Sequence, residues 1–273
     1  MRRAISWRRT TLVSVLMLPY ILPFSYLLYT SFKSNESFNE DPLALSGFRG
    51  LVSYREAWTS SSLGPDLLHS LLAASVGIIV SVACSLVAGY WLFASAWRIA
   101  KVLVSAGLLV AMSVPSTVYV VPLFVQLAAL HLVDNLIILG IIYGAIGTPL
   151  GSFLVRSFLS QLPTSLFDAA AVDGVTTAWL LRRIVLPLTL PTIGTVATLI
   201  GILGMSDLLL SSVMITSTNN TTAVVGVATL ADVYNSQIPE VSAGVIIVLV
   251  PILIVFMVAQ RTLQRGITAG IER

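Results

Sequence analysis

Residues 168–187 read DAAAVDGVTTAWLLRRIVLP, a polar and charged stretch between two long apolar runs of the chain. Its skeleton is an acid with two alanines, a glycine and a later Ile-x-Leu-Pro group: Asp168, Ala169, Ala170, Gly174, Ile184, Leu186 and Pro187. Glycine favours a turn, so the segment is expected to form a helix, a turn at Gly174 and a second helix. Such an ordered loop in so apolar a chain indicates a docking element for a partner.

Composition places the chain in a lipid bilayer. Of its 273 residues, 56% are hydrophobic and only 10% are charged, whereas soluble domains carry about 25% charged residues. The net charge of +3 does not indicate nucleic-acid binding, because the cations fall in short clusters between apolar runs, as topology signals do. The one cysteine, Cys84, lies inside an apolar run. A disulfide framework within the chain is therefore excluded, and no metal site is expected.

A helix needs about 20 apolar residues to cross the hydrocarbon core. Six stretches qualify: 11–32, 68–94, 102–128, 135–158, 184–210 and 241–260. The first is too long for a signal peptide and lacks a cleavage site, so an uncleaved helix is expected. The prediction is an all-α protein with an N-terminal segment 1–10, a six-span domain 11–260 and a tail 261–273.

Several spans contain residues that disturb or loosen a helix. Pro115 and Pro122 in the third span are expected to kink it, as is Pro251 in the sixth. The fourth span holds four glycines and a proline: Gly140, Gly144, Gly147, Pro149 and Gly151. Glycines in membrane helices permit close packing, and broken backbone can also line a water-filled cavity.

The basic residues orient the spans, because cytoplasmic segments are rich in lysine and arginine. Six spans put both termini on one side, and of the 15 cations all but Lys33, Arg49 and Arg55 fall on that side. Both termini and the 160–183 loop are therefore predicted to be cytoplasmic in a multi-pass membrane protein. Residues 33–67 form the longest outer segment, with a short surface helix expected around residues 53–58.

Within residues 160–183, Thr164 is a candidate N-cap, with Asp168 in the first turn near the positive end of the helix. A second helix, TTAWLLRRIV, is expected to follow Gly174 and continue into the fifth span. Ala169 and Ala170 leave a flat face suited to a partner's groove. An amphipathic helix lying in the headgroup region is an alternative reading of the same residues.

The spacing acid-Ala-Ala-x3-Gly-x9-Ile-x-Leu-Pro resembles the EAA loop of ABC importer permeases, with Asp168 in place of the usual glutamate. In that family the loop forms a coupling helix that docks into a cleft of the ATP-hydrolysing subunit. The resemblance implies contacts to the ATPase from Asp168, Ala169, Ala170, Asp173, Gly174, Leu186 and Pro187.

Further stretches are similar to carbohydrate-importer permeases of the maltose type, specifically the smaller partner of a permease pair. They are TSFKSNE (30–36), residues 135–174, RRIVLPLTLPTI (182–193) and QRTLQRGITAGIER (260–273). In some members the tail reaches between the ATPase subunits, which implies contacts from Gly266, Thr268, Ala269 and Gly270. The alternative is that the tail is a frayed basic terminus with no contact to the ATPase subunits.

The family implies four kinds of partner: a second homologous permease, two ATP-binding subunits, an extracytoplasmic solute-binding protein and membrane lipid. ATP and Mg²⁺ are expected on the partner ATPase, with no cofactor on this chain. One departure from the family pattern puts in doubt any substrate assignment taken from better-known relatives. Met205-Ser206-Asp207 stands where the family often has Trp-Asn-Glu. His69 likewise replaces an asparagine before the second span.

Asp207 is the one acid placed within a predicted span, where a charge is costly and usually functional. It either faces a translocation path or lies at the outer interface. Four polar or amphipathic residues are further candidates for the path: Ser206, Gln126, Tyr119 and Tyr143. The tyrosines could instead anchor the protein at an interface.

The sequence lacks a GxxxxGK[ST] loop and the HExxH and GxSxG motifs, so neither ATP hydrolysis nor membrane-enzyme chemistry is expected of this chain. The prediction is the permease subunit of an ATP-driven sugar importer in a prokaryotic cell membrane. One alternative is an importer of another solute, such as a polyol, a glycerol phosphate or an oligopeptide. A phosphate-bearing solute would predict a basic intramembrane residue, and none is visible. An ion-coupled secondary transporter would predict several intramembrane acids.

Overall fold

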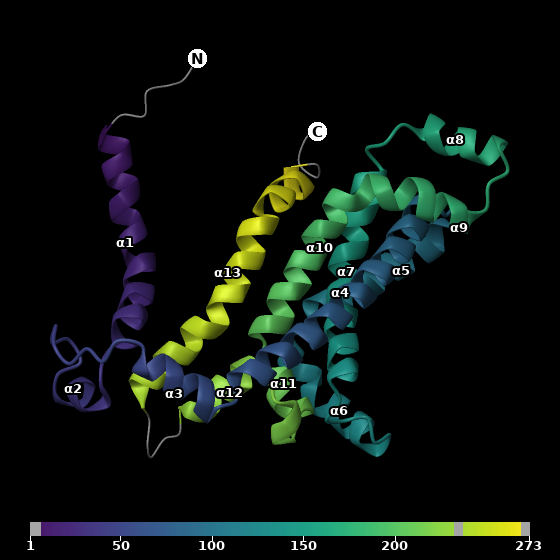
Figure 1. Cartoon of the computed structure of the whole chain (residues 1–273). Helices are drawn as coiled ribbons and strands as arrows, with labels where there is room; N and C mark the ends of the chain where they lie inside the picture. The colour runs from purple at the N-terminus through teal and green to yellow at the C-terminus, as the bar shows by residue number, and fades with distance from the viewer. Residues whose placement is uncertain (1–6, 232–236, 269–273) are drawn as a thin grey trace. The chain divides into compact units, whose positions relative to one another are not determined.

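The structure, a computed structural model, describes residues 7–231 and 237–268, and that part is helical apart from loops and one isolated bridge between Lys33 and Phe48 (Figure 1). The chain divides into two compact units. The smaller comprises Met1–Gly64 and Gly226–Val250, and the larger comprises Pro65–Val225 and Pro251–Arg273. The all-α prediction is confirmed.

The smaller unit contains three complete helices and parts of three others. The complete helices are α1 (Trp7–Thr30), α2 (Asn35–Glu40) and α3 (Val52–Ser60). The parts are the first two residues of α4 (Leu63–Ala94), most of α12 (Ala223–Leu230) and the first part of α13 (Ile238–Thr268). Ser34 caps α2, because its hydroxyl accepts a hydrogen bond from the Ser37 amide at 3.1 Å. The surface helix expected around residues 53–58 is confirmed as α3.

The larger unit contains the remaining helices and most of the long apolar ones. In chain order these are α4 (Leu63–Ala94), α5 (Arg98–Ser113), α6 (Ser116–Ala129), α7 (Leu136–Leu159), α8 (Thr164–Val172), α9 (Thr177–Leu180), the π-turn η1 (Leu181–Val185), α10 (Leu186–Ser206), α11 (Leu209–Met214) and the 3-10 turn η2 (Thr218–Asn220).

Length and composition make four helical segments able to cross a membrane: Leu63–Ala94, Leu136–Leu159, Thr177–Ser206 and Ile238–Met257. The bent pair α5–α6 adds a fifth if it is one span. In α1 a shorter apolar helix, Val15–Thr30, occupies the place of the first predicted span. Among the described residues, all six predicted stretches are thus mainly helical, while the count of six spans stays a prediction.

The third predicted span, 102–128, is not one straight helix. It breaks between α5 and α6, which meet at an angle of 97°. Val114 is extended at the break, because a proline ring disfavours the helical conformation for the residue before it. Pro115 itself is also extended. Pro122, by contrast, lies inside α6 without ending it. The expected kink at Pro115 is therefore confirmed, but it is a sharp corner rather than a bend within a span.

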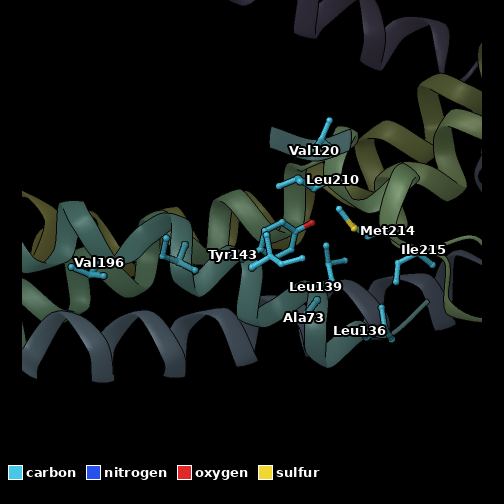
Figure 2. Packing of buried hydrophobic residues seen from close by; sticks show 11 residues of the cluster. Ala73, Val120, Leu136, Leu139, Tyr143, Val196, Leu210, Met214 and Ile215 are labelled. Atoms are coloured by element: carbon cyan, nitrogen blue, oxygen red, sulfur yellow. The ribbon is translucent and has the colours of Figure 1, made fainter. Parts of the chain in front are cut away.

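Glycines on one face of α7 allow it to pack closely against its neighbours. A Cβ atom at Gly140 would lie 2.6 Å from the carbonyl oxygen of Ala73, and one at Gly147 would lie 2.1 Å from Ile200 Cδ1. Beside this face lies a core cluster that includes Leu139, Tyr143 and Val196 (Figure 2). The packing role predicted for the α7 glycines is confirmed at these two positions.

Candidate functional site

The 160–183 loop begins with α8, which starts one residue earlier than a capping role for Thr164 requires. Pro163, with φ −59° and ψ 131°, is the residue that flanks the helix, and it makes no side-chain cap bond. Thr164 is therefore the first helical residue and not the N-cap, and Asp168 lies in the second turn rather than the first. The predicted capping interactions are wrong in both respects.

The predicted turn at Gly174 is confirmed. Its φ of +63° lies in the left-handed region, and a Cβ added there would meet nothing within 4 Å. Glycine is thus required for backbone conformation rather than for space. The amide of Gly174 donates to the Ala171 carbonyl at 3.1 Å, which closes the C-terminal end of α8.

The second helix of the loop also forms where predicted. The Thr176 hydroxyl caps α9 by accepting a hydrogen bond from the Trp179 amide at 3.3 Å. A π-turn, η1, then carries Arg182 and Arg183 into α10. Because Pro187 has no N–H to donate, the helical ladder is interrupted there, and the wide turn lies directly before it. The sequence pattern did not predict this π-turn.

The predicted docking residues differ in exposure. Asp168, Ala169, Asp173 and Gly174 are exposed, as is Pro187, and Leu186 is half-buried. Ala170, however, is only 6% exposed. Its side chain packs inside the protein, so the flat alanine face expected from Ala169 and Ala170 together is not available to a partner.

A cluster of apolar side chains holds α8 to the ends of the long helices. Its buried members are Val155, Leu159, Ala170, Leu180 and Val185. Phe167 of α8 adds a ring contact to Phe93 of α4, with centroids 4.8 Å apart and planes tilted by 52°. The exposed residues of α8 are consequently carried on a helix that is packed against α4, α7 and η1.

A second feature of the larger unit is a cavity of about 890 Å³. Its wall comes from the α5–α6 corner, from α7 and from α10. Tyr119 and Asp207, two of the predicted path residues, line it. Tyr143 is fully buried behind the wall. Gln126 and Ser206 are exposed and are not among the lining residues.

Asp207 is fixed at the junction of three helices. It is the C-cap of α10, and its amide donates to the Leu203 carbonyl at 2.9 Å. Its Oδ2 accepts hydrogen bonds from the Tyr143 hydroxyl and from the Ser211 amide, each at 3.0 Å. The structure thus unites Asp207 with Tyr143 and adds Ser211, a partner that the sequence pattern did not reveal.

A polar cluster outside the spans was also missed. The Oδ1 atom of Asp134 accepts hydrogen bonds from the Ser217 amide at 3.0 Å, the Ser217 hydroxyl at 2.9 Å and the Thr216 amide at 3.2 Å. The Ser217 amide is the main cause that holds the pKa of Asp134 below its usual range. The cluster ties the loop before α7 to the loop after α11.

The predicted contacts of the C-terminal tail are not tested. Gly266 and Thr268 belong to α13, and Ala269 and Gly270 lie outside the described residues. His69 has a local role, since its Nδ1 lies 3.0 Å from the Thr221 carbonyl oxygen.

Comparison with protein families gives a match over residues 81–269, to the family described as "Binding-protein-dependent transport system inner membrane component". Among curated proteins, the chain is 27% identical to a trehalose transport system permease protein of Mycobacterium tuberculosis, covering 98% of this chain and 97% of the relative. It is 29% identical to a probable starch degradation products transport system permease protein of Thermoanaerobacterium thermosulfurigenes, covering 96% and 94%.

Among solved structures, the chain resembles a bacterial ABC transporter involved in the import of the acidic polysaccharide alginate. The TM-score is 0.74 at 20% sequence identity, over 92% of this chain and 94% of the other. At this identity the likeness establishes the fold.

Proposed function

The chain belongs to the family of binding-protein-dependent transport system inner membrane components, and on that premise we propose that it is a permease subunit of an ATP-driven importer of a sugar or oligosaccharide. It forms half of a translocation pathway, with a second homologous permease forming the other half. Two ATP-binding subunits hydrolyse ATP, and an extracytoplasmic binding protein delivers the solute. This chain binds no cofactor itself.

The observation that carries the proposal is the construction of the 160–183 loop. Its helix α8 presents Asp168, Ala169 and Asp173 to solvent, while Phe167 and Ala170 pack against the permease. A helix with an exposed face and an anchored face suits the transfer of motion from an ATPase to the spans. The excess of lysine and arginine on the same predicted side supports a cytoplasmic position for this loop.

The cavity of about 890 Å³ supports the conduit role. It lies beside the glycine-rich α7 and the α5–α6 corner, where the helical backbone is broken by a bend of 97°. Irregular backbone at membrane depth is tolerated where it lines a cavity. The sugar assignment rests on relatives named for trehalose and for starch degradation products.

The test is co-purification of the tagged chain from its native membrane, comparing the wild type with Ala169→Glu. Ala169 is the better target because it is exposed, whereas a glutamate at Ala170 would disrupt the buried cluster. The matched control is Ala178→Glu, which makes the same change at an exposed position of α9, outside α8.

We expect an ATPase and a second permease to accompany the wild type and Ala178→Glu, and the ATPase to be lost from Ala169→Glu. Retention of the ATPase by Ala169→Glu would place the docking surface elsewhere. A chain that purifies without any ATPase in all three samples would overturn the importer assignment and favour ion-coupled transport.

A further inference from the structure

The described side chains that line the cavity in the larger unit include a negatively charged type but no positively charged type. Among the described residues that line it, Asp207 is the one carboxylate, and none is a lysine, arginine or histidine. The other polar side chains are the hydroxyls of Ser116 and Tyr119. The remainder of the wall is aliphatic, glycine, proline or methionine, so little in it can offset the charge of Asp207.

The carboxylate is held in place by two hydrogen-bond donors. The Tyr143 hydroxyl and the Ser211 amide both bind Oδ2 at 3.0 Å. No described residue donates to Oδ1, which remains an acceptor for a solute in the cavity. An ionised carboxylate accepts hydrogen bonds and offers none.

The backbone at Asp207 carries partial charges of both signs. Asp207 is the C-cap of the 21-residue helix α10, whose C-terminal end carries a partial negative charge from its unpaired carbonyl groups. The Ser211 amide, which donates to Oδ2, belongs to the first turn of the six-residue helix α11. In an apolar cavity these charges are screened less than in water, because the effective dielectric constant is lower.

We propose that Asp207 makes this cavity selective by charge, so that it admits neutral, hydroxyl-rich solutes and excludes acidic ones. Hydroxyl groups can donate to Oδ1, and a bond from a hydroxyl to an ionised carboxylate is stronger than one between neutral groups. A carboxylate, sulfonate or phosphate on the solute would be repelled. This inference rests on the proposed conduit function and specifies the class of sugar that it carries.

The test uses charged thiol reagents as probes, so it does not need the natural solute. The only native cysteine, Cys84, is exposed and is first replaced by serine. A single cysteine is then placed in the cavity wall at Ala145, or in a second variant at Leu203, one helical turn before Asp207. The assembled importer is prepared in lipid nanodiscs.

Each variant is treated with two methanethiosulfonate reagents of similar size, one bearing trimethylammonium and the other sulfonate. The ratio of their modification rates reports the local potential. We expect Asp207→Asn to lower the cation-to-anion ratio at least about tenfold, since the potential of a unit charge in the wall of an apolar cavity is poorly screened. Asparagine can still accept the Tyr143 bond.

Two controls make the result specific. Glu36→Gln removes a charge from α2, which does not line the cavity, and should leave the ratio unchanged. In the protein that retains Asp207, raising the salt concentration should lower the ratio, because mobile ions screen the carboxylate. This second measurement needs no substitution at Asp207.

The possible failures are distinct. A reactive thiol whose ratio is insensitive to both Asp207→Asn and salt would overturn the charge selectivity and leave the conduit function standing. Thiols at 145 and 203 that neither reagent reaches in any state of the ATPase cycle would show that the cavity is closed to water. That result would overturn both the selectivity and the conduit.

Discussion

The ring of Phe167 in α8 lies 4.8 Å from the ring of Phe93 in α4, tilted by 52°. This contact joins a short helix of the 160–183 loop to a helix of 32 residues that is apolar enough to cross a membrane. Tilted aromatic pairs at this separation are attractive beyond the apolar area that they bury. Phe167 therefore serves as a rigid link between the loop and the spans.

Replacement of Phe167 by alanine should loosen this link at a cost of about 1–3 kcal/mol, below the range for fully buried rings because Phe167 is half-buried. We expect solute moved per ATP hydrolysed to fall severalfold while the ATPase stays bound. Phe167→Leu, which keeps most of the apolar volume, should retain more coupling. Simultaneous measurement of uptake and ATP hydrolysis in proteoliposomes tests this, and unchanged coupling in Phe167→Ala would contradict it.

The Asp134 cluster gives a prediction for pH. Donors from Ser217 and Thr216 lower the pKa of Asp134 from its usual 3.8, so the ionised carboxylate stabilises the folded loops. This contribution is fully present above about pH 4 and is lost as pH falls through the lowered pKa. The amide hydrogen-exchange rates of residues 214–220, corrected for the intrinsic pH dependence of exchange, should thus be constant between about pH 5 and 8. They should accelerate only in stronger acid.

Asp134→Asn separates charge from backbone conformation. The φ of Asp134 is +61°, and asparagine tolerates that region nearly as well as aspartate. At pH 7 the variant should show faster exchange at the Thr216 and Ser217 amides without refolding of the turn. Exchange as slow as in the wild type would mean that the charge contributes nothing there.

Hydropathy and the Gly174 turn predicted most of the helical order in this protein. Long apolar runs identify α4, α7 and α10 because each apolar residue contributes independently to the favourable free energy of transfer from water into the bilayer. Gly174 identifies a turn because other residues are strained at its φ of +63°. These signals are local, and the structure agrees with them.

The features that sequence did not predict depend on distant contacts or on direction. A proline at 115 predicts a break, but the 97° corner depends on what packs on either side. Residues 169–171 of α8 are all alanine, so the sequence alone does not distinguish the buried Ala170 from the exposed Ala169. Asp207 is hydrogen-bonded to Tyr143, which lies 64 residues away in the sequence, and no local sequence pattern predicts that pairing.

Lys33 organises the loop after α1 and provides a third prediction. It is fully buried, and its ammonium donates to the carbonyl oxygens of Asp41 at 2.7 Å and Ala44 at 2.9 Å. Lys33→Met keeps the apolar stem and removes both donors, at a cost of about 3 kcal/mol for two charge-assisted bonds. We expect faster proteolysis between residues 33 and 51. Arg49→Met, which removes an exposed cation from the same loop, should be nearly neutral.

The last prediction concerns the glycine face of α7. A Cβ at Gly140 would lie 2.6 Å from both the Ala73 carbonyl oxygen and Val76 Cβ. Neither atom is the end of a flexible side chain, so Gly140→Ala must push α7 away from α4. Overpacking of this kind typically costs about 1–3 kcal/mol.

Gly107 of α5 is the matched control, because a Cβ there would meet nothing within 4 Å. Gly107→Ala should be neutral or stabilise its helix by about 0.5–1 kcal/mol, since alanine loses less backbone entropy on folding. Midpoints of thermal aggregation are measured by size-exclusion chromatography of heated samples. The midpoint should fall for Gly140→Ala and should stay the same or rise for Gly107→Ala. Equal shifts for both variants would contradict the close approach of α7 to α4 as the reason for glycine at 140.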